Sequence, residues 1–372
     1  MEPVTISLAP KSEQKRIVKK IESLQARSQR AREALTEVGP LLEQIRQSVL
    51  AAAFRGDLTA DWRAAHPDVE PASVLLDRIR QERRQKWEAA ELAKYKAKDK
   101  QPPKNWQGKY KEPEPVDTTD LPELPEGWCW SRLDEIAIIQ SGVTLGSKKR
   151  DGSIYVSVPY LRVANVQRGY LVLDEVKEIE VTEARARDLA LREGDILFNE
   201  GGDRDKLGRG WVWQNEIEVC IHQNHVYRAR LDISAFIPEL VSHYSNEFGK
   251  DYFFRNASQS VNLASINKTQ LSGLPLPIIP IKEQKVLIEK LNGLLDICDL
   301  MESSMTSSKS NLTQLDQSIL SKAFRGELVP QDPNDEPAAE LLARIKAARE
   351  AEQATKKKQP AKRKQKKTAG RS

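Results

Sequence analysis

Residues 280–285 read Pro-Ile-Lys-Glu-Gln-Lys, and residues 317–328 read Gln-Ser-Ile-Leu-Ser-Lys-Ala-Phe-Arg-Gly-Glu-Leu. Near the start of the chain, residues 10–15 read Pro-Lys-Ser-Glu-Gln-Lys, and residues 47–58 read Gln-Ser-Val-Leu-Ala-Ala-Ala-Phe-Arg-Gly-Asp-Leu. The two copies keep an offset of 270 residues, with no insertion between their ends. Two copies so far apart do not build a solenoid, so the sequence predicts two matched arms around a unique middle part.

Both copies of the repeat carry a heptad pattern. Apolar and small residues recur at alternating spacings of four and three over residues 287–319 and, at the same offset, over residues 17–49. This pattern predicts two long helices packed side by side as an antiparallel coiled coil, each a rod of roughly 60 Å. Gly56 and Gly326 stand where the helices should end. Pro40 is expected to kink or break the first helix.

The composition favours a helix-rich, water-facing protein with two or three structural units. Of the 372 residues, 30% are charged and 6% are aromatic, and the mean hydropathy is −0.59. No run of 18 apolar residues is present, and the first residues lack the pattern of a secretory signal, so no membrane span is expected. Three widely spaced cysteines, Cys129, Cys220 and Cys298, favour a reducing, cytoplasmic location.

The positive net charge resides in the end of the chain. The formal charge is +5, but residues 355–372 contain nine Lys or Arg and no acidic residue. The remaining 50 basic and 54 acidic residues give −4. Such a basic block is typical of a disordered tail, which either holds phosphates non-specifically or has no dedicated role.

The chain is expected to be an α+β protein in which one mixed α/β domain is flanked by the two long helices. The middle part favours strands over residues 156–161, 196–198 and 226–231, a hairpin joining 211–213 to 217–221, and helix over 236–254. The predicted parts are a stub of a preceding domain (1–9), a first helical spacer (10–97), a Pro/Lys-rich linker (98–122), the mixed domain (123–280), a second helical spacer (281–354) and the tail (355–372).

The sequence offers little support for catalysis. It contains no Walker-type phosphate loop and no methyl-transfer motif. Residues 283–285, Glu-Gln-Lys, match half of a nuclease site, but they recur at 13–15 and are better interpreted as acidic helix-start residues. Cys220, His222 and His225 offer at most three ligands where structural zinc needs four. No metal and no cofactor is therefore expected.

Three polar stretches in the middle part are candidates for binding. Residues 140–150, 199–210 and 259–270 are rich in Asn, Gln, Ser, Thr, Lys and Arg. The amide, hydroxyl and guanidinium groups pair with base edges, and Lys and Arg reach phosphates. Each stretch alone could be a surface turn, but together they favour a loop-based DNA reader over a catalyst.

At these residues the sequence closely resembles the specificity subunits of type I restriction-modification enzymes. The resemblance rests on Leu-Pro-Glu-Gly-Trp at 124–128, Pro-Tyr-Leu-Arg-Val-Ala-Asn-Val at 159–166, Gly-Asp-Ile-Leu at 194–197 and Asn-Leu-Ala-Ser-Ile-Asn at 262–267. The arms look like the family's conserved spacer helices. The resemblance covers nearly everything except the tail, and it makes the middle part a target-recognition domain.

The resemblance implies a non-catalytic subunit that reads one half of a split site in double-stranded DNA. It also implies docking to adenine methyltransferase (modification) subunits and, through them, to restriction/translocase subunits. The residues expected to contact DNA come from the three polar stretches and one family motif: Thr144, Lys148, Lys149, Arg162, Asn165, Arg204, Lys206, Arg209, Asn262, Asn267 and Lys268. For Arg162 and Asn165, a role in holding the loop is an equal alternative.

The chain departs from the family in carrying one recognition domain instead of two. A homodimer or a second half-specificity chain could supply the other domain and, in the symmetric case, read a palindromic split site. Three other functions stay open. The chain could be a coiled-coil adaptor for proteins, an inactive remnant, or an enzyme that holds a metal with Glu200, Asp203 and Asp205.

Overall fold

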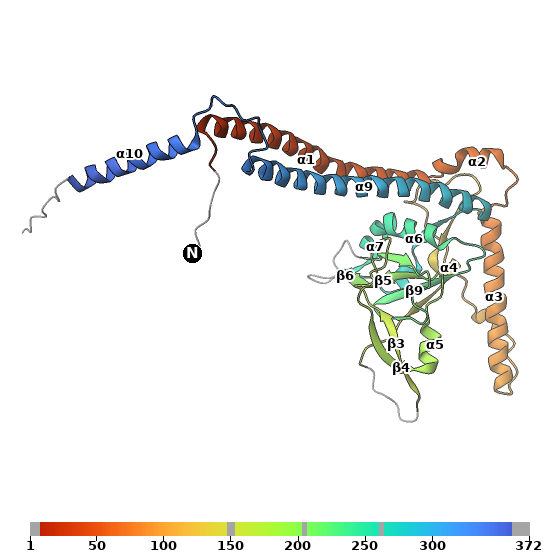
Figure 1. Ribbon diagram of the computed structural model, residues 1–372. Helices are drawn as coiled ribbons and strands as arrows, with labels where there is room; N and C mark the ends of the chain where they lie inside the picture. Colours follow the sequence, from red (N-terminus) through yellow and green to blue (C-terminus); the bar gives the residue numbers. More distant parts are fainter. Residues whose placement is uncertain (1–7, 147–152, 203–206, 260–263, 359–372) are drawn as a thin grey trace, which may run out of the picture. The chain divides into compact units, whose positions relative to one another are not determined.

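The computed structural model describes residues 8–146, 153–202, 207–259 and 264–358 (Figure 1). The chain divides into two compact units. Unit 1 contains residues 1–43 and 299–372, and unit 2 contains residues 44–298. None of the described helices is long and apolar enough to cross a lipid bilayer.

The two arms are helices of equal length. α1 (Lys11–Phe54) and α9 (Ile281–Phe324) have 44 residues each. Each is followed two residues later by a left-handed glycine, Gly56 at φ 79° and Gly326 at φ 75°, so the predicted helix ends are confirmed. The predicted break at Pro40 does not occur, because α1 continues through it. Gly39 precedes this proline and has no Cβ to clash with its ring.

In unit 1 the arms run antiparallel, as predicted. Arg32 on α1 forms an ion pair of 2.6 Å with Asp316 on α9, and Arg16 forms one of 2.6 Å with Asp335 beyond the end of α9. Positions earlier in one arm therefore meet positions later in the other. Ser28 and Ile319, both on the heptad seam, are buried. The last helix of this unit is α10 (Ala338–Lys358).

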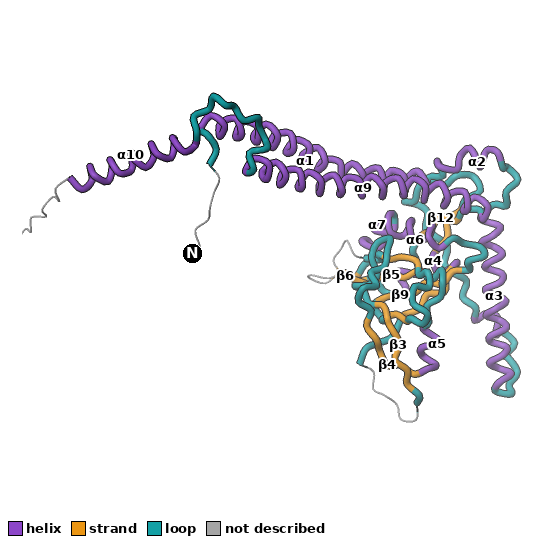
Figure 2. The backbone as a smooth tube through the Cα atoms, viewed as in Figure 1, coloured by secondary structure: helices purple, strands orange, loops and turns teal. Residues whose placement is uncertain are grey.

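Unit 2 contains a mixed domain built from small sheets (Figure 2). The largest has the order β2-β9-β5-β7 and is antiparallel throughout: β2 (Ala137–Ser141), β9 (Val226–Leu231), β5 (Ile196–Asn199) and β7 (Gly210–Val212). A second sheet contains β4 (Lys177–Thr182), β3 (Tyr155–Leu161) and β8 (Ile221–His222). A third has the order β10-β11-β6: β10 (Ser258–Gln259), β11 (Ala264–Ser265) and β6 (Gly201–Gly202). β1 (Cys129–Arg132) pairs with β12 (Pro275–Ile278).

Three predicted strands are confirmed and the predicted hairpin is wrong. β3, β5 and β9 cover residues 156–161, 196–198 and 226–231. Residues 211–213 and 217–221 do not pair with each other, since β7 pairs with β5 and β8 pairs in parallel with β3. Asn215, in the middle of the predicted turn, has a left-handed backbone with φ 64°.

The helices of unit 2 surround these sheets. α3 (Ala72–Ala97) lies in the last part of the predicted first helical spacer, 10–97. The helix predicted over 236–254 is divided in two at Phe248. The others are short: η1 (Asp57–Thr59), α2 (Ala60–Ala65), η2 (Trp106–Lys109), α4 (Leu133–Ile136), α5 (Glu183–Leu189), α6 (Pro238–Glu247), α7 (Gly249–Asn256) and α8 (Lys268–Ser272).

The main core of unit 2 joins the arm ends to the domain. Phe54 from α1, Leu75 from α3 and Leu287 and Leu291 from α9 lie in one cluster with the sheet residues Ile196 and Phe198, among others. Leu287 and Leu291 are completely buried. The heptad positions at the start of α9 therefore serve two purposes, because they form the arm seam and also anchor the domain.

Candidate nucleic-acid interface

The second and third polar stretches meet in one small sheet. β11 pairs with β6 through Ala264–Gly202 and Ser265–Gly201, and it pairs with β10 through Ala264–Gln259. Gly202, Ala264 and Gln259 therefore lie side by side in adjacent strands. The chain enters residues 203–206 from Gly202 and residues 260–263 from Gln259, so both stretches depart from the same edge.

The first polar stretch emerges at the same side of the neighbouring sheet. β2 and β5 both pair antiparallel with β9, so they run in the same direction. Ser141 at the end of β2 and Phe198 near the end of β5 both face Tyr227 of β9. Gly142 follows directly, and a Cβ there would lie 1.9 Å from the carbonyl oxygen of His222. Only glycine allows this approach, which fixes where the first stretch departs.

Polar contacts between the sheets hold this edge together. The carboxylate of Glu200 accepts a hydrogen bond of 3.3 Å from the Tyr227 hydroxyl and is paired with His225. The backbone N–H of Ile266 donates to the carbonyl oxygen of Glu200 at 2.8 Å. Burial and the Glu200 carboxylate raise the pKa of Tyr227 to about 12, so its hydroxyl stays a donor at neutral pH. These contacts connect the β5–β6 segment to β9 and β11.

Two of the sequence-predicted residues are used inside the fold. Asn165 is 2% exposed. Its oxygen accepts from the Arg162 backbone N–H at 2.9 Å, and its amide donates to the carbonyl oxygens of Val172 and Glu175. The Arg162 side chain contacts the Glu175 carboxylate at 3.3 Å. This arrangement favours the loop-holding alternative for both residues.

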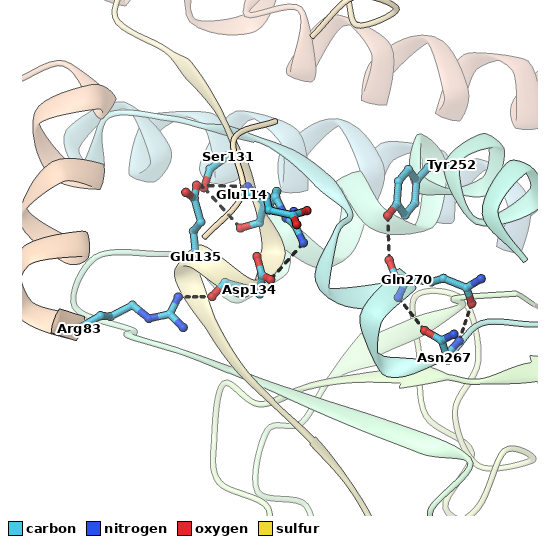
Figure 3. A network of polar contacts seen from close by, with 9 residues as sticks. Arg83, Glu114, Ser131, Asp134, Glu135, Tyr252, Asn267 and Gln270 are labelled. Atoms are coloured by element: carbon cyan, nitrogen blue, oxygen red, sulfur yellow. Dashed lines mark hydrogen bonds and ion pairs between the residues drawn. The ribbon is translucent and has the colours of Figure 1, made fainter. Parts of the chain in front are cut away.

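Four other predicted residues lie at or near the edge. Thr144 and Lys268 are exposed, and Arg209 is half-buried beside β7, with a hydrogen bond of 3.4 Å to the Val163 carbonyl oxygen. Asn267 is exposed and forms the N-cap of α8, where it exchanges hydrogen bonds of 2.9 and 2.7 Å with Gln270 (Figure 3). Five predicted residues lie outside the described part of the chain: Lys148, Lys149, Arg204, Lys206 and Asn262.

Two structural asparagines were missed by the sequence reasoning. Asn199 is completely buried at the end of β5, and its amide donates to the carbonyl oxygens of Val163 and Val166. Asn246 on α6 exchanges hydrogen bonds of 3.0 and 2.7 Å with the backbone of Gly210. The only signal in the sequence for Asn199 is its place at the end of an apolar strand, next to the charged loop that it supports.

In the Cys220–His225 region, both histidines form contacts within the fold. His222 is completely buried and donates from Nδ1 to the Val226 carbonyl oxygen at 2.6 Å, while His225 is turned to Glu200. Burial lowers the pKa of His222 to about 4, with a smaller contribution from Arg228 that is opposed by Asp195. Across the described residues, no group of three or more His, Cys, Asp or Glu side chains is arranged to hold a metal ion.

The buried neutral His222 should make the domain sensitive to acid. Below pH 6.5 the unfolded chain binds a proton that the folded state excludes, so stability should fall by about 1.4 kcal/mol per pH unit until about pH 4. When the pH is lowered from 7 to 5, urea unfolding should show a smaller loss of stability for His222→Gln than for the wild type. His66→Gln, at an exposed position, should keep the wild-type loss. Equal losses in all three proteins would contradict this assignment.

The fold defines a class of protein in which paired helical arms carry an α/β domain at their ends. A solved chain described as part of a study of complex assembly and conformational transition of the type I restriction-modification system shares this fold, with a TM-score of 0.55 at 19% identity. The match covers 87% of this chain and 62% of that one. No protein-family model matches the chain.

The chain is a homologue of the specificity subunits of type I restriction enzymes, as the sequence motifs predicted. It is 24% identical over 356 residues to the StySPI specificity subunit of Salmonella potsdam, covering 93% of this chain and 64% of the relative. It is 24% identical over 362 residues to the EcoKI specificity subunit of Escherichia coli K12, covering 94% and 64%. The chain thus spans about two thirds of the length of these relatives.

Proposed function

We propose that this chain is the DNA-recognition component of a type I restriction-modification complex and reads one half of a split site. The observation that carries the proposal is the convergence of three polar stretches at one edge of the domain, through the pairing of β6, β10 and β11 and the parallel exit of β2 and β5. Loops held on a rigid scaffold are suited to base readout. The kinship with specificity subunits supports the same function.

The reading residues are proposed to be the exposed ones and those within the loops: Thr144, Lys148, Lys149, Arg204, Lys206, Arg209, Asn262, Asn267 and Lys268. Arg162 and Asn165 hold the loop between β3 and β4. The arms serve as the spacer to which methyltransferase subunits, and through them restriction subunits, dock. No catalytic step is assigned to the chain itself.

The two ends of the repeat support a place for a second recognition domain. Phe54 packs against the domain and is 7% exposed, whereas its repeat equivalent, Phe324, is 72% exposed. Glu13 is buried like Glu283, and Gln14 donates to the Ala9 carbonyl oxygen as Gln284 does to that of Ile279. The end of the arm pair that contains Glu13, Gln14 and Phe324 thus repeats the features that anchor the domain in unit 2. We propose that a domain of the same fold, from a second copy or another chain, covers Phe324.

Substituting Asn267 by aspartate should change the DNA sequence that is read without unfolding the domain. Asp caps helices about as well as Asn, so α8 should persist. Loss of the amide donor should change the free-energy difference between the preferred base and the other bases at one position of the DNA site by about 1–3 kcal/mol. The measurement is a map of methylated adenines in cells that carry each variant. Asn165→Ala is the matched control, and it should lower stability without changing the motif.

The primary test is the same methylation map with and without the gene. A split motif that disappears on deletion supports the proposal, and a palindromic motif indicates two identical halves. Unchanged methylation would favour the adaptor or the inactive remnant.

The enzyme alternative has less support, because both oxygens of the Glu200 carboxylate are engaged by His225 and Tyr227. Asp203 and Asp205 lie outside the described residues.

A further inference from the structure

A long hairpin of one helix and a mostly non-helical returning segment projects from unit 2, and the DNA-reading edge does not account for it. Its outgoing limb is α3, and its returning limb is the segment that contains η2. In Figure 1, α3 extends along the domain toward the end where β3, β4 and α5 lie. The hairpin tip, defined here as residues 94–111, contains seven lysines and one acidic residue, Asp99.

The base of the hairpin is anchored firmly. Leu75 and Leu76 are buried in the main core. Arg80 pairs at 2.9 Å with Glu135, which is 2% exposed, and Arg83 donates to the Asp134 carbonyl oxygen (Figure 3). The base therefore cannot pivot without breaking buried contacts, and it fixes the direction in which the tip points.

The two limbs are clasped by aromatic rings. Trp87 on α3 stacks on Trp106 of η2 at a centroid distance of 5.9 Å and contacts Tyr110 at 5.3 Å. Arg84 lies 5.9 Å from the centre of the Tyr110 ring and forms an ion pair of 3.4 Å with Glu112. The clasp makes the hairpin one stiff body. About 13 helical residues separate Arg83 from Lys96, so Lys96 lies roughly 20 Å beyond Arg83 along α3, while Trp106 and Tyr110 bring the returning limb back to Trp87.

The charge of the tip is not neutralised locally. Lys94 pairs with Glu91 at 2.5 Å. Within the described residues, the other six lysines of the tip are exposed and form no ion pair: Lys96, Lys98, Lys100, Lys104, Lys109 and Lys111. Residues 94–111 carry +6, whereas residues 1–354 as a whole carry −4, so the remainder of that region carries −10. Positive charge is thus concentrated on a rigid projection of an otherwise acidic body.

We propose that the hairpin tip binds the phosphates of duplex DNA outside the half-site that the domain reads. This inference rests on the proposed function, since it needs DNA at the domain. Lysine ammonium groups that neutralise phosphates release the counterions condensed on DNA, and this binding is independent of sequence. The roughly 20 Å between Arg83 and Lys96 corresponds to about six base pairs of duplex, at 3.4 Å each, and this sets the length of flank to be tested.

The test measures DNA affinity as a function of salt for the full chain in complex with its methyltransferase subunit. The probe is a duplex with the mapped motif and long flanks. The variant replaces five of the six unpaired tip lysines by glutamine: Lys96, Lys98, Lys100, Lys104 and Lys109. We expect the slope of log affinity against log salt to become shallower by about 2–4, because each phosphate contact contributes about 0.9. Its methylated motif should stay unchanged.

A trimmed duplex adds an independent measurement. Removing about six base pairs from one flank should reduce the salt slope of the wild type but leave the tip variant unaffected. Replacing the same five lysines by arginine should restore the wild-type slope, because the charge is retained.

Three outcomes would overturn the inference. An unchanged salt slope in the tip variant would exclude phosphate contact by the tip. An unchanged slope together with loss of the co-purifying methyltransferase subunit would make the tip a contact for an acidic protein surface. An altered methylation motif would make it part of base readout. If the wild-type complex does not bind the duplex, the proposed function itself fails. If the complex binds the duplex but the tip variant keeps the wild-type salt slope, only the inference about the hairpin fails.

Discussion

Replacing Phe54 by alanine should lower the free energy of unfolding of the domain by about 3–5 kcal/mol, whereas Phe324→Ala should cost less than about 1 kcal/mol. The two residues occupy the same position of the repeat. The Phe54 ring contacts Tyr244 and Phe248 edge-on, at centroid distances of 5.2 and 5.8 Å. Removing it leaves a cavity and forfeits two aromatic contacts. Phe324 is 72% exposed and leaves no cavity.

The measurement is urea unfolding followed by tryptophan fluorescence, since Trp128, Trp130 and Trp213 belong to the domain. Phe54→Leu is the control and should lose less than Phe54→Ala, because it keeps most of the buried apolar surface. Phe324→Ala should instead weaken assembly with a second recognition domain, measured as the mass of the complex in solution. Equal destabilisation by both alanine substitutions would contradict the different roles of the two repeat ends.

The repeat made much of the fold predictable, because helix period and helix ends are local properties. The heptad pattern placed both arms, and Gly56 and Gly326 marked their ends. Pro40 was expected to kink or break the first helix, and the break does not occur, since the effect of a proline depends on its neighbour, here a glycine. The hairpin around Asn215 failed for another reason. A turn signal in the sequence is local, but the two flanking strands pair with the distant strands β3 and β5.

The candidate site was predictable in its residue types but only partly in its geometry. Asn, Arg and Lys in a glycine-rich stretch predict hydrogen bonding, yet the sequence does not distinguish a base contact from a contact within the fold. Asn165 illustrates this limit, since three hydrogen bonds inside the domain use its carboxamide. The meeting of residues 199–210 with 259–270 depends on pairing across about 60 residues of chain, which no local pattern encodes.

The role of Glu283 needed the structure most. From sequence it was interpreted as an acidic residue at a helix start, because Glu13 recurs at the same position of the other arm. In the fold its side chain is 1% exposed and meets donors from two other segments. It accepts from the Thr59 hydroxyl at 2.6 Å and the Trp128 indole N–H at 2.9 Å, and it is paired with Arg63. Glu283, the acidic residue at the start of α9, thus also joins this arm to the segments that contain Arg63 and Trp128.

Replacing Glu283 by alanine should therefore destabilise unit 2 by about 3–5 kcal/mol, because it leaves the Arg63 charge and two buried donors without an acceptor. Glu283→Gln should cost less, since it keeps one oxygen for Trp128 or Thr59. The measurement is again urea unfolding at neutral pH, with the exposed Glu289→Ala as the matched control on the same helix. That control should change stability by less than about 0.5 kcal/mol.

A double substitution separates the ion pair from the rest of the network. Arg63 also donates to the Gly56 carbonyl oxygen at 2.8 Å and lies 5.8 Å from the Trp128 ring centre, so Arg63→Ala should be destabilising by itself. The combined Glu283→Ala and Arg63→Ala variant should lose less than the sum of the single losses, because the second change removes the charge that the first left unpaired. Strict additivity would mean that the pair does not act as a unit. The anchor of the domain on the arm would then rest on separate contacts: Glu283 with Trp128, Gln284 with Ala235, and the buried side chains of Leu287 and Leu291.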